Sequence, residues 1–491
     1  MWSRAPTGTS RTALISVGLG LVAFLLHMVA LGRPGPWDDE AVTVLSVRRS
    51  LASLVGSLRL HDLVHGPYYF VGHLWGSVFG TEVVDIRVLS ALSVGVATGL
   101  MVVLGTMLLG LTFGVSSALV FTTLPRVIWT ATEARSEAIV TAVVIAAMIS
   151  FLVALRRDSV GIWFGYGLLL VFSFHLFEFA VLNFLVLPLV ALAVQPTRRA
   201  VIRLCVTTAL AALACVPFLL HTARQLDTIS WIAQSFTLNG ALKAIWTSQF
   251  LTPEGVPRWV AIDVMVWLIA LAGILLAAWR ARKDLDARVT AVLTTGWLIL
   301  PTIFLLGYSL LVTPAFEQRY LASSAPALAM AVALALFYVP LPRRKEVAAA
   351  VLLVLVMLLS SGAWVRYHQT WAKSGWLEVA QAVQANKKQG DVVVAAGPLE
   401  AASVVVLPDE FSGLDVINID VPYYADNTPW GRVTMIGDDP KLLNGHQRVW
   451  YLGADGIAEA DAAAFKAQGF TERWREQKYR LGAILYERDQ T

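Results

Sequence analysis

Three consecutive carboxylates follow the first long apolar segment of the chain, and these residues are well suited to chemistry. Asp38, Asp39 and Glu40 lie in the stretch 36–67, which also holds His65 near its end. A carboxylate at a membrane surface can take a proton as a general base or bind a polar ligand. Ionisable side chains at membrane depth are costly and usually functional, whereas the cost near the interface is small. The segments that position this stretch indicate which role applies, general base or ligand binding.

The composition identifies a membrane protein. Of the 491 residues, 57% are hydrophobic and only 15% are charged, whereas soluble domains carry roughly 25% charged residues. The net charge of +4 is small, and the basic residues stand in short clusters between apolar runs. Such clusters orient a membrane protein. We therefore expect contact with membrane lipids and no nucleic-acid partner.

The two cysteines, Cys205 and Cys215, fall within one predicted membrane span. Ten helical residues separate them by about 15 Å, which is too far for a disulfide. Two cysteines in this arrangement also make no metal site.

A helix that crosses the bilayer needs roughly 20 apolar residues. About eleven segments come near this length, so the sequence predicts an α-helical polytopic membrane protein. They are Thr12–Leu31, Ile86–Leu109, Gly114–Thr130, Ser136–Leu155, Val160–Phe174, Phe179–Val194, Val201–His221, Trp259–Trp279, Val289–Leu311, Tyr320–Val339 and Val347–Ala363.

The basic clusters predict the orientation of these spans. Arg4 and Arg11 precede the first span, so the N-terminus should be cytoplasmic. Alternation then places the later basic clusters inside as well. It places the first loop, 33–85, outside, together with the outer ends of the later spans. The topology stays consistent only if Pro67–Gly80 does not cross the membrane, so we interpret it as an interfacial helix.

By the same argument, Trp37–Leu60 is predicted as a helix lying on the outer surface. The long loop Thr222–Arg258 should also lie outside.

The composition changes after residue 363, and we expect two domains, 1–363 and 364–491. The second carries mixed charge and no run long enough to cross a membrane. Alternating short strands and helices predict a small extracytoplasmic α/β domain. The strands are predicted at Asp391–Ala396, Val416–Ile419, Arg448–Leu452 and Leu481–Glu487, and the helices at Glu378–Asn386 and Glu459–Gln468.

Further polar residues stand at the predicted outer ends of spans. They are Glu133 with Arg135, His175 with Glu178, and Glu317 with Arg319 followed by Tyr320. Each alone is equally compatible with a solvated loop charge. Their occurrence on one side of the membrane, under a topology deduced from other residues, favours a shared site.

The order of these outer motifs resembles a known family. Asp39–Glu40, the His-Gly-Pro-Tyr-Tyr run at 65–69, Leu74–Gly80 and the span opening at Arg87–Leu92 are similar to the GT-C glycosyltransferases. More narrowly, they resemble the bacterial protein-mannosyltransferase-like group of the ArnT-like superfamily. The later motifs are Glu133–Ser136 and Arg319–Leu321, and the resemblance covers roughly 12–335. Glu137 departs from the pattern, since many relatives carry an aromatic residue there.

The resemblance implies a GT-C fold and a membrane glycosyltransferase. Such an enzyme moves a sugar, mannose-like or another hexose or pentose, from a polyprenyl-phosphate donor to an extracytoplasmic hydroxyl. The acceptor is a glycan, a lipid or a protein. Some enzymes of this type use a divalent metal and others do not; we expect no obligatory metal and no other cofactor.

Asp39 is our candidate for the general base, because attack on an anomeric carbon requires removal of the acceptor proton. Glu40 either orients Asp39 or binds sugar hydroxyls, and Asp38 is interpreted as a neighbouring loop charge. Arg135 and Arg319 suit the leaving phosphate, since guanidinium binds oxyanions in a bidentate way.

The other candidates are substrate-binding residues with open alternatives. Glu133 holds a sugar hydroxyl or fixes an arginine, and Tyr320 adjoins Arg319. His65 contacts phosphate or acceptor, or is structural, and His175 and Glu178 bind substrate or end two short spans.

Two other function classes remain open. A transporter or flippase of a lipid-linked saccharide would carry polar residues near the bilayer midplane, but charges here gather at span ends. A non-catalytic scaffold would not need the acids and arginines together. The sequence does not define the donor sugar, acceptor, oligomeric state or role of the C-terminal domain.

Overall fold

A computed structural model describes residues 9–225, 230–252, 260–339, 344–454 and 456–489. Of the residues used above, Arg4, Arg258 and Trp259 lie outside these ranges, as do parts of the loop Thr222–Arg258. The chain divides into two compact units, each made of two separate stretches. The first comprises residues 1–29 and 88–366, and the second comprises 30–87 and 367–491.

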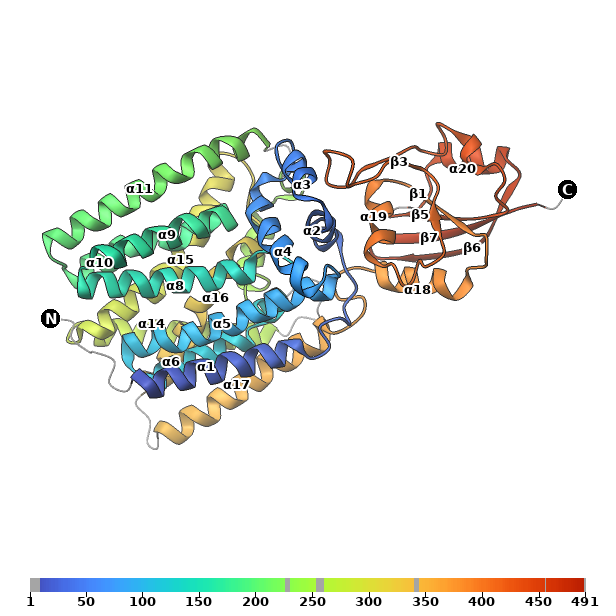
Figure 1. Cartoon of the computed structure of the whole chain (residues 1–491). Coiled ribbons are helices and arrows are strands. Elements are labelled where there is room, and N and C mark those ends of the chain that lie inside the picture. Colours follow the sequence, from blue (N-terminus) through green and yellow to red (C-terminus); the bar gives the residue numbers. More distant parts are fainter. Residues whose placement is uncertain (1–8, 226–229, 253–259, 340–343, 455, 490–491) are drawn as a thin grey trace. The chain divides into compact units, whose positions relative to one another are not determined.

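The first unit is a bundle of long helices lying side by side (Figure 1). Its elements are α1 (Thr9–Met28), α5 (Val83–Leu109, whose first turn counts with the second unit), α6 (Leu111–Thr123), α7 (Pro125–Ala131), α8 (Glu137–Arg157), α9 (Val160–Leu176), the 3₁₀ segment η2 (Glu178–Val186), α10 (Leu187–Val194), α11 (Arg198–Thr222), α12 (Ser230–Ser235), α13 (Leu238–Trp246), α14 (Val260–Arg280), α15 (Leu285–Leu311), the 3₁₀ segment η4 (Gln318–Ser324), α16 (Ala325–Tyr338) and α17 (Arg344–Tyr367).

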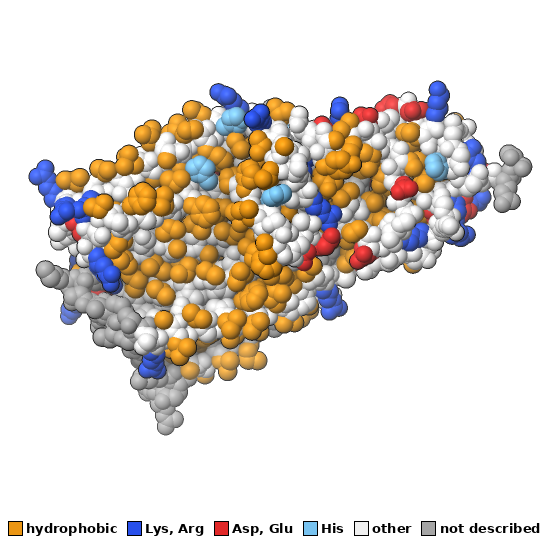
Figure 2. Space-filling model, viewed as in Figure 1, with side chains coloured by type: hydrophobic (Ala, Val, Ile, Leu, Met, Phe, Trp, Pro, Cys, Tyr) orange, Lys and Arg blue, Asp and Glu red, His pale blue; other side chains and the backbone are white. Residues whose placement is uncertain are grey.

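These helices confirm the polytopic membrane architecture. In the described residues, seven helices are long and apolar enough to cross a membrane, and α6 with α7 forms one further candidate bent by 68°. Three shorter apolar helices, Val160–Leu176, Glu178–Val194 and Ala348–Leu358, fall on the remaining predicted spans. Apolar side chains cover most of this unit on the face shown in Figure 2. In a bilayer these side chains meet lipid instead of water.

Close backbone contacts hold the bundle together where glycines face a neighbouring helix. A Cβ on Gly95 of α5 would lie 2.7 Å from the carbonyl oxygen of Gly20 on α1. One turn on, the Ser16 hydroxyl of α1 donates to the carbonyl oxygen of Gly99 at 2.6 Å. Small residues at such crossings allow the van der Waals contact that replaces the hydrophobic effect in lipid. The Gly95–Gly99 pair therefore packs within the chain.

The second unit combines the first loop with the C-terminal stretch. The loop forms α2 (Asp38–Arg48), α3 (Leu51–Leu58), η1 (Leu63–His65) and α4 (Gly66–Phe79). The C-terminal stretch forms α18 (Trp376–Asn386), β1 (Val392–Ala395), α19 (Pro398–Val406), β2 (Asp415–Val416), β3 (Ile419–Val421), β4 (Arg432–Val433), η5 (Pro440–Leu443), β5 (Arg448–Gly453), α20 (Glu459–Ala467), β6 (Phe470–Lys478) and β7 (Leu481–Arg488).

A mixed five-stranded sheet forms the centre of the C-terminal stretch. Its strand order is β2-β1-β5-β7-β6, and β3 and β4 form a separate antiparallel pair. The first three strands are parallel, and β7 runs antiparallel to both β5 and β6. Strand β5 is buried along almost its whole length. The expected α/β fold of this stretch is thus present.

Two local predictions need correction, and one strand was not predicted. The helix expected over Trp37–Leu60 is two helices, because Arg49 adopts an extended conformation and the Ser50 side chain caps α3 by accepting from the Ser53 amide. The strand expected at Val416–Ile419 is divided between β2 and β3. Strand β6 was not predicted because it is rich in charged residues, as edge strands often are, and has no apolar run.

Interactions between its two stretches hold the second unit together. Arg49, which is only 1% exposed, donates to the carbonyl oxygens of Asp426 at 2.8 Å and Thr428 at 2.6 Å. Arg48 donates to the Val405 carbonyl at 2.9 Å. The first loop thus packs as part of the fold of residues 367–491.

Candidate functional site

The three acids form the first turn of α2. Asp38, Asp39 and Glu40 follow Trp37, whose extended backbone begins the helix. The N-terminus of a helix presents unpaired amides and a positive dipole end, so it stabilises ionised carboxylates. Glu40 is fully buried, whereas Asp38 and Asp39 are partly exposed. The helix N-terminus therefore favours the charged form of these carboxylates, and burial opposes it.

Glu40 lies in a buried ion triad. Arg87 donates to both of its carboxylate oxygens, at 2.7 Å from Nε and 2.6 Å from Nη2. Lys373 Nζ lies 2.9 Å from Oε1. The side chains of all three residues are at most 1% exposed. Since these contacts occupy both carboxylate oxygens, the geometry favours the orienting role for Glu40 over binding of a sugar.

Arg87 also fixes the chain that leads into α2. Its Nη1 donates to the carbonyl oxygens of Leu31 at 3.1 Å and Pro34 at 2.7 Å, and its Nη2 reaches the Gly35 carbonyl at 3.3 Å. The arginine of the sequence motif thus binds the loop on both sides of the α2 start.

Asp38 is bound by a cation from the β6–β7 turn. Arg480 Nη1 lies 2.7 Å from its Oδ2, and the guanidinium also lies over the Trp37 ring at 5.3 Å. Burial raises the pKa of Asp38 above its ordinary value, although attraction to Arg480 opposes this shift.

The end of the first loop carries a second polar cluster. The Tyr69 hydroxyl donates to Asp62 at 2.5 Å, and His65 Nε2 lies 4.0 Å from the other Asp62 oxygen. Gly66 and Pro67 then begin α4, where proline suits the first helical turn. The structure confirms this helix over Gly66–Phe79; its interfacial location stays a prediction.

The remaining predicted residues belong to the first unit. Glu133 and Arg135 occupy the turn between α7 and α8 and are buried, with exposures of 2% and 7%. Arg319 and Tyr320 begin η4. Both α7 and α8 pack against η4, so these two motifs lie at the same end of the unit.

His175 and Glu178 lie at the end of α9 and the start of η2. Phe177 and Phe179, which flank Glu178, contact the Tyr320 ring at centroid distances of 5.2 and 5.4 Å. His175 Nδ1 is 2.8 Å from the Val171 carbonyl, and its ring packs on Phe218 of α11 at 4.6 Å. Glu178 is therefore adjacent to the Tyr320 aromatic cluster, whereas His175 packs between helices.

The predicted site residues thus form two groups. Asp39, Glu40 and His65 belong to the second unit. The other six, namely Glu133, Arg135, His175, Glu178, Arg319 and Tyr320, belong to the first.

Two buried polar residues of the first unit were not predicted from the sequence. Asn183 of η2 donates to the Ser323 hydroxyl at 2.9 Å and accepts from Trp297 at 2.8 Å and Ser324 at 2.9 Å. Arg126 of α7 donates to the carbonyl oxygens of Gln249, at 3.1 Å, and Ser248. A polar residue inside an apolar run was the available signal for both.

The described residues contain no obvious cluster of metal ligands. His61 and His65 stand four residues apart, which is a spacing that helical metal ligands use. Across the part of the chain that the structure describes, however, no three His, Cys, Asp or Glu side chains come together as metal ligands.

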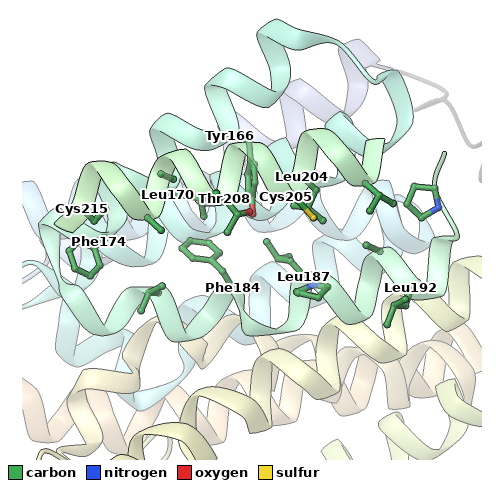
Figure 3. A pocket seen from close by; sticks show the side chains of 18 of the residues that line it. Tyr166, Leu170, Phe174, Phe184, Leu187, Leu192, Leu204, Cys205, Thr208 and Cys215 are labelled. Carbon is green, nitrogen blue, oxygen red and sulfur yellow. The ribbon is translucent and has the colours of Figure 1, made fainter. Parts of the chain in front are cut away.

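An apolar cavity of about 1060 Å³ lies between α9, η2 with α10, and α11. Figure 3 shows that Phe174, Phe184 and Leu204 are among the side chains that line it. Its few polar or polarisable members are Tyr166, Gln195, Thr208 and the two cysteines, and both cysteines are free. Its size and lining suit a long apolar chain.

Comparisons with known proteins place the fold. No family model and no curated protein matches the sequence. The structure is similar to that of ArnT from Cupriavidus metallidurans, with a TM-score of 0.57, 12% identity and 98% coverage of both chains. The same protein bound to undecaprenyl phosphate gives 0.56 at 12% identity, covering 97% of this chain and 98% of that one.

An oligosaccharyltransferase from Archaeoglobus fulgidus, tethered to an acceptor peptide, gives 0.51 at 12% identity. That match covers 95% of this chain and 73% of the other. The chain described here therefore has a GT-C fold similar to that of ArnT.

Proposed function

We propose that this protein is a membrane glycosyltransferase that moves a sugar from a polyprenyl-phosphate donor to an extracytoplasmic hydroxyl group. The observation that supports it most is the ArnT-like fold, which extends over nearly the whole of both chains. The ArnT structure with undecaprenyl phosphate shows that this fold can hold a polyprenyl phosphate. The apolar cavity between α9 and α11 offers a place for such a tail.

In the proposed reaction, the acceptor oxygen forms a bond to the anomeric carbon while the bond from that carbon to the phosphate oxygen breaks. Asp39 takes the acceptor proton, and polyprenyl phosphate leaves with the bonding electron pair. The helix N-terminus favours an ionised Asp39 before the reaction. The leaving group is already a stable anion, so it needs positive charge more than a proton.

We assign that positive charge to Arg135 and Arg319, which belong to motifs at the same end of the first unit. Glu133 binds a sugar hydroxyl or orients Arg135. Tyr320 and Glu178 border the sugar, whereas His65 contacts phosphate or acceptor. Of these residues, His175 is the weakest candidate for substrate binding, because its ring packs on Phe218.

The test is sugar transfer by the full chain reconstituted in vesicles. Radiolabelled undecaprenyl-phosphate hexoses and pentoses serve as donors, and solubilised envelope lipids, glycans and proteins serve as acceptors. Loss of a general base costs roughly 100-fold or more, so Asp39→Asn should abolish most transfer. Asp409→Asn, which changes an exposed acid of the C-terminal stretch, should have no effect.

Two results would contradict this proposal. Full transfer by Asp39→Asn would exclude Asp39 as the base. Movement of labelled lipid across the vesicle membrane, with no sugar transferred to any acceptor, would instead support a flippase.

A further inference from the structure

The chain around α2 is held from the C-terminal stretch at several consecutive residues. The Gly35 amide donates to the Thr370 carbonyl at 2.8 Å, and the Ser374 hydroxyl donates to the Pro36 carbonyl at 2.5 Å. A Cβ on Gly35 would lie 2.8 Å from the Leu377 Cβ, so the two segments touch closely there. The entry to α2 therefore has little freedom to shift.

The same C-terminal stretch provides a cation for each acid that flanks Asp39. Lys373 binds Glu40 at 2.9 Å, and Arg480 binds Asp38 at 2.7 Å. We propose that Lys373 and Arg480 are positioning residues, which hold the first turn of α2 so that Asp39 presents its carboxylate to the acceptor. This inference rests on the proposed glycosyltransferase function.

Glu40 is held from both of the stretches that form the second unit. Arg87, at the start of α5, binds it through two hydrogen bonds, and Lys373 of the C-terminal stretch binds it as a second cation. Losing one partner of a buried ion pair is strongly destabilising, so each cation restrains Glu40. The Lys373 ammonium also contacts the residue next to Asp39, and a nearby positive charge favours an ionised carboxylate.

Helix geometry explains why two flanking contacts suffice. Successive side chains of a helix project about 100° apart, because one turn takes 3.6 residues. Fixing Asp38 and Glu40 on their own partners therefore fixes the rotation of the turn and the direction of the residue between them. Arg480 adds a contact with the Trp37 ring, which immediately precedes the turn.

The experiment compares Lys373→Met and Arg480→Met with the wild type in the full chain. Lys373→Met leaves the neutral Glu40–Arg87 pair in place, so the fold should survive. Lys387→Met is the matched control, because Lys387 binds the Glu410 and Ser412 carbonyl oxygens within the C-terminal stretch. Lys373→Arg should restore part of the lost function.

For sugar transfer we expect kcat to fall roughly 10- to 100-fold, the scale on which small misplacements act. KM for the undecaprenyl-phosphate sugar should change less than about twofold, since the donor's own contacts remain. The acidic limb of the pH–rate profile should move to higher pH as the positive charge is lost. In an Asp39→Asn background the same changes should have no further effect, because they act through Asp39.

Hydrogen exchange of α2 provides a readout that needs no activity. Amides of a peptide covering 37–48 should exchange about tenfold faster in Lys373→Met and Arg480→Met than in Lys387→Met. Unchanged exchange would overturn the inference even if no sugar donor were found. If the wild type transfers sugar and both variants match its kcat and pH profile, the inference fails while the proposed function stands.

Discussion

Glu40 and Asp39 are neighbours with different surroundings, and the difference determines which of them can act on a substrate. Glu40 is fully buried and binds Arg87 and Lys373. Asp39 is partly exposed on the same helical turn. Because both oxygens of Glu40 are bound by cations, this carboxylate is a poor candidate for the base and a rigid support. Two neighbouring carboxylates thus provide a catalytic candidate and its anchor.

Arg87 should contribute more to stability than Lys373. Arg87→Met removes both hydrogen bonds to Glu40 and leaves the Leu31 and Pro34 carbonyls without this donor. Breaking a buried pair in this way costs about 3–5 kcal/mol. We expect thermal unfolding of the detergent-purified protein to show a larger loss for Arg87→Met than for Lys373→Met. Equal losses would mean that the lysine anchors Glu40 as strongly as the arginine does.

Asp38 should make stability depend on pH. Burial raises its pKa in the folded protein, so the folded state binds the proton more tightly than the unfolded state. The stability due to this carboxyl is present below its unfolded pKa and is lost as pH rises through the folded pKa. Asp38→Asn removes the titrating carboxyl and with it this loss of stability at higher pH.

The melting temperature of Asp38→Asn at pH 7 should therefore equal or exceed that of the wild type. The advantage should vanish towards about pH 4, where an ordinary aspartate titrates. Asp409→Asn should show no such trend. If the melting temperature of the wild type instead rose relative to that of the variant as pH rises, attraction to Arg480 would outweigh burial in setting the pKa of Asp38.

At the scale of elements, two 3₁₀ segments replace the first turns of the helices that continue as α10 and α16. Runs of 3₁₀ helix longer than three or four residues are uncommon and often mark functional places. Here η2 spans nine residues and η4 spans seven, and each leads into a helix with proline in its first turn. Asn183 connects the two segments through Ser323 and Ser324.

Replacing Asn183 with leucine should therefore loosen both segments. The change leaves the Trp297 indole and two serine hydroxyls without this partner, and we expect a loss of about 2 kcal/mol. Thermal unfolding measures the loss, and sugar transfer should fall with it, since Arg319 and Tyr320 belong to η4. Asn386→Leu is the control, because the exposed Asn386 side chain donates to the Ala382 carbonyl of its own helix. An unchanged melting temperature would show that water replaces the amide.

The sequence predicted the elements best where hydropathy alone determines them. All eleven apolar runs correspond to apolar helices of the described residues, and the C-terminal α/β fold follows from its buried strands. It predicted less well where tertiary contacts compete with local pattern. At the break, Arg49 binds the carbonyl oxygens of Asp426 and Thr428, which are 377 and 379 residues away in the sequence. The residues around Arg49 do not indicate these distant partners.

The candidate site shows the same limit. The acids and arginines were recognisable as residue types at span ends and by motif order. Lys373, which binds Glu40, and Arg480, which binds Asp38, were not, because both follow the last span and belong to no motif. Long-range ion pairs depend on the folded arrangement and have no spacing in the sequence.

At the scale of the whole molecule, each unit is assembled from stretches far apart in the chain. The first loop and residues 367–491 share one compact unit, although residues 88–366, with nearly all of the spans, lie between them in sequence. Such non-local contacts raise contact order and slow folding. The loop that carries Asp39 consequently reaches its final structure only after the C-terminal stretch has been made.

This dependence predicts how a truncated chain behaves. In the full chain, trypsin should cleave at exposed Arg59 but spare Arg49, which is buried and bound to the Asp426 and Thr428 carbonyls. A chain ending at Arg366 lacks both partners, so cleavage at Arg49 should become as fast as at Arg59, because proteolysis follows the population of open forms. Mass spectrometry of timed digests in detergent separates the two sites. If Arg49 stayed protected in the truncated chain, the first loop would fold without the C-terminal stretch, and positioning of Asp39 by Lys373 and Arg480 would lose its structural basis.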